Sequence, residues 1–144
     1  MRDIRFRGLT DKGTWVYGNV VYSKDAVEGW EAIIIPQENS NMYSSDETLD
    51  DPILEFEHWY RVDVNTVGQY TGLEDKNGVE IYEGDIIQEL KVNWEVVFYR
   101  SAWRLGRNVK GDMQYKSLDR YAYRCEIIGN IYRNKELLEG KQNV

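Results

Sequence analysis

The stretch that organises this chain, residues 70–86, reads YTGLEDKNGVEIYEGDI. Apolar runs flank its Asp-Lys-Asn-Gly block at positions 75–78, and a second break, Glu-Gly-Asp, follows at positions 83–85. Asp at the first position of a turn accepts backbone N–H bonds, and Asn and Gly at the third and fourth positions tolerate the left-handed conformation. The stretch therefore predicts a β-hairpin that sets the register of the strands around it.

Downstream of this hairpin, residues 86–98 alternate between apolar and polar side chains. One parity holds Ile86, Leu90, Val92, Trp94, Val96 and Phe98, and the other holds Glu89, Lys91, Asn93 and Glu95. Alternation with period two predicts strands that have one buried and one exposed face. We expect a turn near residues 91–93 to divide the segment into two antiparallel strands.

Shorter strands are predicted in the rest of the chain, and helical periodicity is almost absent. Aromatic and β-branched residues indicate strands at 4–6, 15–22, 30–35 and within 121–132, with a break at 8–13 and a last helical turn at 135–139. Both faces of the 15–22 strand are apolar, so both should be covered. Short strands between turn residues predict a mainly β fold, with a small antiparallel barrel in the C-terminal half and a β-rich N-terminal lobe.

The length of 144 residues fits one domain, or one domain with an attached lobe. We place the β-rich lobe at residues 1–66 and the barrel at residues 67–144. Residues 37–52 are rich in Asn, Ser, Asp and Glu, which predicts a mobile acidic loop. Residue 1 is not followed by an apolar signal region, and no apolar run approaches the ~20 residues that cross a bilayer, so we expect an intracellular protein without membrane contact.

Charge is distributed unevenly along the chain, whose formal net charge is -7. Between Asp25 and Tyr60 there are 10 acids and no Lys or Arg, whereas residues 87–135 hold 10 bases and 5 acids. One interpretation is a solvated acidic loop beside an ordinary mixed surface. The other is a dipolar molecule whose acidic arm contacts the basic region of its own chain or of a neighbour.

Several short motifs resemble those of one known family. They are Thr-Gly-Leu at 71–73, Asp-Lys-Asn-Gly at 75–78, Ile-Tyr-Glu-Gly-Asp-Ile at 81–86, Ile-Gly-Asn-Ile-Tyr at 128–132, Asn134 and Glu-Leu-Leu at 136–138, with a looser match at Ile4, Phe6, Arg7 and residues 15–18. On these residues the chain resembles the YopX family of phage and prophage proteins. The resemblance implies a small phage-associated protein in the cytoplasm of a bacterial host, with an SH3-like barrel in the C-terminal half, and it carries over no catalytic residue.

The motif residues themselves suit turns better than chemistry. Glycine supplies positive φ angles, and Asp or Asn accepts backbone amides. We interpret eight of them as structural: Gly72, Asp75, Asn77, Gly78, Gly84, Asp85, Gly129 and Asn130. The glycine spacing fits neither a P-loop nor a dinucleotide fingerprint, so no cofactor is predicted.

The sequence offers few histidine or cysteine side chains for catalysis or metal binding. His58 is the only histidine and Cys125 the only cysteine, so one chain can build neither a structural zinc site nor an intramolecular disulfide. We expect Cys125 to pack as a small apolar side chain. Asp85, Glu89 and Lys91 resemble the Asp…Glu-x-Lys pattern of metal-dependent nucleases, but motifs this short often match by chance. We therefore predict no catalytic residue and no metal site.

A mixture of aromatic and basic side chains is the better candidate for binding. Exposed aromatics beside bases can stack on nucleobases or hold proline-rich peptides, although the same rings can instead complete a small core. The candidate binding residues are Trp103, Arg104, Arg107, Tyr121, Tyr123 and Arg124. We predict a non-catalytic protein-interaction or assembly module, acting on a protein partner or by self-association. The alternatives are nucleic-acid binding through this basic aromatic face and, less favoured, metal-dependent nuclease activity.

Overall fold

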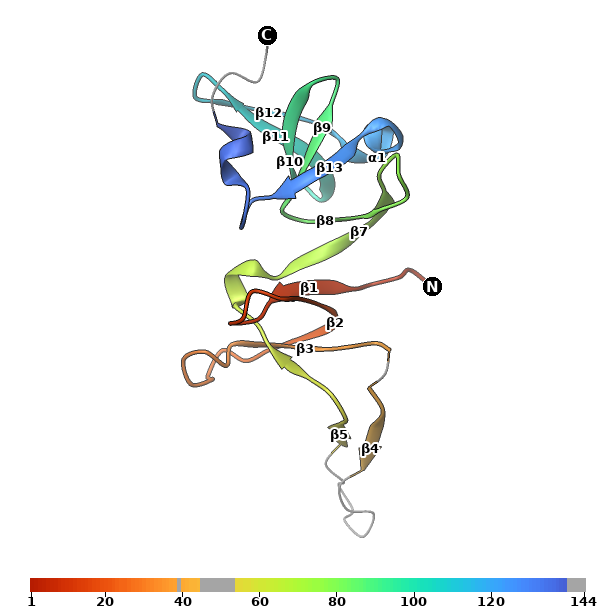
Figure 1. Ribbon diagram of the computed structural model, residues 1–144, viewed down its shortest axis with the longest axis vertical. Coiled ribbons are helices and arrows are strands. Elements are labelled where there is room, and N and C mark those ends of the chain that lie inside the picture. The colour runs from red at the N-terminus through yellow and green to blue at the C-terminus, as the bar shows by residue number, and fades with distance from the viewer. Residues whose placement is uncertain (39, 45–53, 140–144) are drawn as a thin grey trace. The chain divides into compact units, whose positions relative to one another are not determined.

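The computed structural model describes residues 1–38, 40–44 and 54–139, which form mainly antiparallel β-structure (Figure 1). Its contacts divide the chain into two compact units. The N-terminal unit is Ile4–Gly68, and the C-terminal unit is Met1–Asp3 with Gln69–Val144. Within the described part of the chain no helix is long and apolar enough to cross a membrane.

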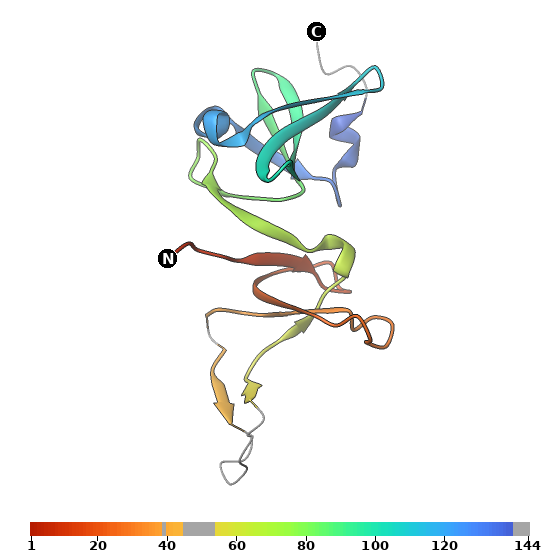
Figure 2. The ribbon, with the colours of Figure 1, turned by 180° about the vertical axis from the view of Figure 1, so that it is seen from behind.

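The N-terminal unit contains one sheet and one separate hairpin. The sheet strands are β1 (Phe6–Leu9), β2 (Trp15–Tyr22), β3 (Ala32–Ile35) and β6 (Tyr60–Arg61), in the antiparallel order β6-β3-β2-β1. Strands β4 (Met42–Ser44) and β5 (Leu54–Phe56) pair with each other and extend away from this sheet (Figures 1 and 2). A 3-10 turn, η1 (Val64–Thr66), follows β6. Ala32, Ile34 and Val62 form the buried core, against which Phe6, Val16 and Val20 pack.

The structure of the N-terminal unit differs from two of the sequence-based predictions. Strand β1 continues through Gly8, where a break was predicted, because this glycine serves close packing: an added Cβ would lie 2.8 Å from the Cβ of Val62. Part of the expected mobile loop at residues 37–52 is strand β4. Residues 39 and 45–52 of that loop lie outside the described residues.

The C-terminal unit pairs a hairpin with a five-stranded sheet. The hairpin is β7 (Gly68–Glu74) with β8 (Glu80–Tyr82). The sheet strands are β9 (Asp85–Glu89), β10 (Val92–Tyr99), β11 (Ala102–Val109), β12 (Asp112–Ser117) and β13 (Glu126–Asn130), in the antiparallel order β12-β11-β10-β9-β13. The mainly β, antiparallel class is therefore confirmed. The strand order is that of an open sheet with edges β12 and β13, so the expected closed barrel is not formed.

A short helical segment that the sequence did not predict covers one face of this sheet. It consists of α1 (Leu118–Tyr121) and the 3-10 turn η2 (Ala122–Arg124), and a second 3-10 turn, η3 (Lys135–Leu138), follows β13. Leu118 and Ala122 of this segment, and Cys125 directly after it, are buried in one core. The other buried members of that core are Ile81, Ile87, Trp94, Val96 and Leu105. Cys125 packs as the small apolar side chain that we expected, and burial raises the pKa of its thiol.

Across the turn between β9 and β10, the positions that share the face of Trp94 and Val96 change from odd-numbered to even-numbered residues. Leu90 and Lys91 both adopt positive φ (51° and 65°), forming a two-residue turn one residue earlier than predicted. Glu89 pairs with Val92, and Ile87 with Trp94, so odd positions of β9 share a face with even positions of β10. Glu89, expected on the exposed face, consequently lies on the core face with only 2% of its side chain exposed.

The organising stretch forms the expected hairpin around one buried carboxylate. Asp75 Oδ1 accepts the backbone N–H groups of Asn77 (2.8 Å) and Val79 (3.0 Å), and Oδ2 accepts that of Ile127 (3.1 Å). Gly78 has a φ of 78°, whereas Asn77 does not take the left-handed conformation predicted for it. The side chain of Asp75 therefore both closes the hairpin and connects it to β13.

The second glycine break of this stretch gives a direct stability prediction. Gly84 has a φ of 88°, and an added Cβ would lie 3.1 Å from the ring of Tyr132. We expect Gly84→Val to lower the free energy of unfolding by about 2–3 kcal/mol, because a β-branched residue is strained at positive φ. Lys76→Ala is the control, since it removes a side chain whose ion pair with Glu126 (3.5 Å) is exposed and worth about 0–1 kcal/mol. Urea melts that give equal midpoint shifts for the two variants would contradict the prediction.

Candidate functional site

One apolar face of the sheet in the N-terminal unit lies opposite the core. Side chains alternate along β3, so Ala32 and Ile34 enter the core while Ile33 and Ile35 point to the opposite face. Val21 on β2 pairs with Ile33 and lies on this second face, where it is 47% exposed. The sequence predicted that both faces of β2 would be covered, but this part of its second face is open.

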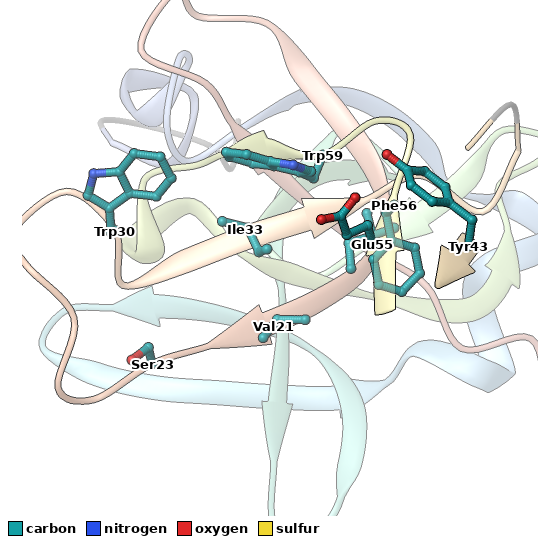
Figure 3. A pocket seen from close by; sticks show the side chains of 9 residues that line it. Val21, Ser23, Trp30, Ile33, Tyr43, Glu55, Phe56 and Trp59 are labelled. Atoms are coloured by element: carbon teal, nitrogen blue, oxygen red, sulfur yellow. The ribbon is translucent and has the colours of Figure 1, made fainter. Parts of the chain in front are cut away.

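Aromatic side chains from the surrounding segments turn this face into a groove of about 560 Å³. We call it the aromatic groove, and its lining residues are Val21, Ser23, Trp30, Ile33, Ile35, Tyr43, Glu55, Phe56 and Trp59. Figure 3 shows Trp30 at one end, Tyr43 and Phe56 at the other, and Trp59 between them on the side of Ile33. Trp30 and Trp59 lie with ring centroids 5.7 Å apart, and both remain partly exposed (41% and 46%).

One carboxylate and one guanidinium lie at the groove. Glu55 lies beside Tyr43, and the hydrogen bond from the Tyr43 hydroxyl to this carboxylate raises the pKa of the hydroxyl. The guanidinium of Arg61 lies 4.2 Å from the centroid of the Trp30 ring and donates to the Gly29 carbonyl (2.9 Å). This contact shows that the ring can hold a cation.

A second arrangement, in the C-terminal unit, gathers cations around two aromatic rings. We call it the basic cluster, and its residues are Glu89, Trp94, Arg107, Lys116, Arg120, Tyr121 and Arg124. Lys116 Nζ lies 4.5 Å from the ring centroids of both Trp94 and Tyr121. Arg107 lies 4.9 Å from the Trp94 ring, and Arg124 and Arg120 lie 4.7 Å and 6.0 Å from the Tyr121 ring.

One buried carboxylate anchors this cluster from β9. Glu89 forms ion pairs with Lys116 and with Arg124, whose guanidinium nitrogen lies 2.7 Å from Glu89 Oε1. The two cations come from β12 and η2, so Glu89 connects β9 to two elements that lie further along the chain. An ion pair within a desolvated site is screened much less by salt than a surface pair.

The structure brings three of the six candidate binding residues together in the basic cluster: Arg107, Tyr121 and Arg124. Trp103 instead packs edge-on against Phe98 (4.9 Å) beside the core. Arg104 lies on the opposite sheet face, where its Nε donates to the Tyr99 carbonyl (2.9 Å). The remaining candidate, Tyr123, is exposed on η2.

Three members of the basic cluster were not assigned to a binding site from the sequence: Glu89, Trp94 and Lys116. Glu89 was assigned to the exposed face because the β9–β10 turn was placed one residue late. Lys116 joins the cluster because β12 pairs with β11, and the residues around position 116 do not encode that pairing. Trp94 was correctly assigned to a buried strand face, but its contact with cations depends on that pairing.

The nuclease-like residues are not assembled into one site. Asp85 accepts the backbone N–H of Tyr82 (2.7 Å), which closes a turn. Glu89 is already paired with two cations and lies four residues further along β9, about 13 Å away at strand spacing. Lys91 lies in the exposed β9–β10 turn. Among the described residues, no group of three or more His, Cys, Asp or Glu side chains could hold a metal ion.

The last two motif residues also take part in backbone geometry. Asn130 Oδ1 accepts the backbone N–H groups of Tyr132 and Arg133, both at 3.0 Å. A Cβ at Gly129 would lie 2.5 Å from Asn134 Oδ1, so only glycine allows that side chain to cap the end of β13. These contacts give the motif a role in building turns.

Together, these features describe a small antiparallel β-protein. Its motif residues build turns, and its described surface carries an aromatic groove and a basic cluster. The chain belongs to the YopX family: the family described as YopX protein matches residues 5–139, which confirms the resemblance seen in the sequence. None of the curated proteins compared with the chain matches it significantly. Among solved structures, it is similar to the crystal structure of protein EF1440 from Enterococcus faecalis, at 26% identity and a TM-score of 0.49, covering 96% of this chain and 100% of that one.

Proposed function

We propose that this protein is a non-catalytic protein-interaction module, and that the aromatic groove binds an extended, basic segment of a partner protein. The observation that carries the proposal is the open apolar face of β2 and β3, where Val21, Trp30 and Trp59 remain exposed although the core is complete. Aromatic-lined grooves are a recurrent way to bind extended peptides. The groove is elongated from Trp30 to Tyr43, which suits an extended segment (Figure 3).

The basic character of the partner follows from charge. The chain between Asp25 and Tyr60 supplies most of the groove and contains 10 acids without any Lys or Arg. Complementary charge steers encounter and selects partners. A Lys or Arg of the partner can lie over the exposed ring of Trp59 in the way that Arg61 lies over Trp30, while its apolar neighbours fill the space beside Val21 and Ile33.

Three finer features belong to the same proposal and rest on the family. They are an origin in a phage or prophage, action in the bacterial cytoplasm, and an SH3-like character of the C-terminal unit. The short antiparallel strands of the five-stranded sheet β9–β13 are consistent with the last of these.

Selection from a random peptide display library tests the groove directly. Selected peptides should be enriched in Lys or Arg together with apolar residues, and their binding should change the emission of the groove tryptophans. Val21→Lys should weaken binding of a selected peptide about tenfold, or ~1.4 kcal/mol, because it places a cation within the groove. Val27→Lys is the matched control, since Val27 is exposed in the same unit but does not line the groove.

Two results would contradict the proposal: selection of acidic peptides, or equal losses of affinity in the two lysine variants. Sedimentation velocity of the chain alone tests whether the protein associates with itself through the groove. A concentration-dependent dimer that Val21→Lys dissociates, and Val27→Lys does not, would identify the partner as a second copy.

A further inference from the structure

The basic cluster carries more positive charge than its carboxylate neutralises. Lys116 and Arg124 share the single carboxylate of Glu89, and the cluster residues as defined above have a formal charge of +3. The cluster also lies in the most basic part of the chain, residues 87–135, which hold 10 bases and 5 acids. A local excess of this kind attracts anions even on a protein that is acidic overall.

The cations are held in place rather than extended into solvent. Stacking on Trp94 and Tyr121 fixes Arg107, Lys116 and Arg124, so little side-chain entropy is lost when a ligand binds. Lys116 and Arg124 keep 24% and 39% of their side chains exposed, which leaves their charged groups within reach of a ligand. The indole Nε1–H of Trp94 is buried and has no acceptor among the described residues, so one further donor lies beside the cations.

We propose that the basic cluster binds the phosphate groups of a nucleic-acid strand. Arg donors arranged around a fixed centre suit phosphate oxygens. Cations lie over the rings of Trp94 and Tyr121, and Trp94 is buried, so these rings are poorly placed to stack on nucleobases. Recognition is therefore of the backbone and independent of sequence. This inference goes beyond the proposed function, since it concerns another unit of the chain and another class of partner.

Fluorescence anisotropy with a labelled oligothymidylate tests the inference on the full chain. With three to four phosphate contacts, each contributing ~0.7, a plot of log affinity against log salt should have a slope of about -2 to -3. Arg107→Gln with Arg120→Gln should weaken binding about tenfold and make the slope shallower by about 1.4, because two contacts are lost while the Glu89 ion pairs are retained. Arg100→Gln with Lys110→Gln is the matched control, since both are exposed bases in turns of the same sheet and lie outside the cluster.

Three outcomes would overturn the inference. Equal losses of affinity in the two double variants would mean that general charge, and not the cluster, binds the strand. An abasic oligonucleotide should bind as tightly as oligothymidylate, and a large loss would show that stacking on bases dominates. Inorganic tripolyphosphate that competes as strongly as the oligonucleotide at equal phosphate concentration would assign the site to free polyphosphate. The wild-type salt slope requires no variant, so it remains a test if the double variant does not fold.

Discussion

Asp75→Ala is expected to lower the free energy of unfolding by about 3 kcal/mol or more. The carboxylate is buried and accepts three backbone N–H groups, from Asn77, Val79 and Ile127. Hydrogen bonds to a charged acceptor contribute about 1.5–3 kcal/mol each, and a buried donor left without an acceptor costs about 1–3 kcal/mol. Some of these amides regain water when the turn loosens, so the expected total is smaller than the sum.

Urea denaturation measures this loss, and two variants control it. Asp75→Asn keeps one oxygen acceptor and should fall between wild type and Asp75→Ala. Asp112→Ala removes an exposed carboxylate at the start of β12 and should stay within about 0.5 kcal/mol of wild type. Hydrogen exchange gives a second readout, because the amide of Ile127 on β13 should lose protection in Asp75→Ala. If the losses in Asp75→Ala and Asp112→Ala were alike, the carboxylate would not be organising the hairpin.

The parts of the fold that sequence predicted are those decided by local chemistry. The hairpin around residues 75–78 was predictable because Asp accepting amides and Gly at positive φ are properties of the turn itself. The β9–β10 hairpin shows the limit of this reasoning. Leu90 and Lys91 carry no turn preference, yet they form the turn, and a shift of one residue moved Glu89 from the exposed face to the core face.

The aromatic groove and the basic cluster depend on contacts between distant segments, and sequence indicated them only in part. The apolar character of both β2 faces predicted burial, but which side chains would reach the second face was not encoded near residues 15–22. Trp59 lines it from the segment between β5 and β6, which is distant in sequence from residues 15–22. Similarly, Arg104 and Arg107 lie three residues apart in a basic aromatic segment, and because β11 spans both residues, the alternation of side chains along the strand places them on opposite faces.

The second large expected effect concerns Glu89. Glu89→Gln should lower the free energy of unfolding by about 2–3 kcal/mol, because it leaves Lys116 and Arg124 close together without their shared counter-charge. Breaking a fully buried pair costs about 3–5 kcal/mol, and the lower figure here allows for the partial exposure of both cations. Glu126→Ala, which removes the exposed ion pair with Lys76, should cost about 0–1 kcal/mol.

Glu89→Gln also separates the structural role of the cluster from its binding role, because the variant should be less stable but should bind the oligonucleotide more tightly. Removing the carboxylate raises the formal charge of the cluster from +3 to +4, so folded Glu89→Gln should bind oligothymidylate more tightly than wild type, with a steeper dependence on salt. Anisotropy titrations below the unfolding midpoint, with Glu126→Ala as the control for loss of an exposed carboxylate, measure this effect. Tighter binding in both variants to the same degree would show that net charge alone governs affinity. Weaker binding in Glu89→Gln at full folding would mean that Glu89 positions Lys116 and Arg124 for the ligand, and that its ion pairs orient the cations more than they neutralise them.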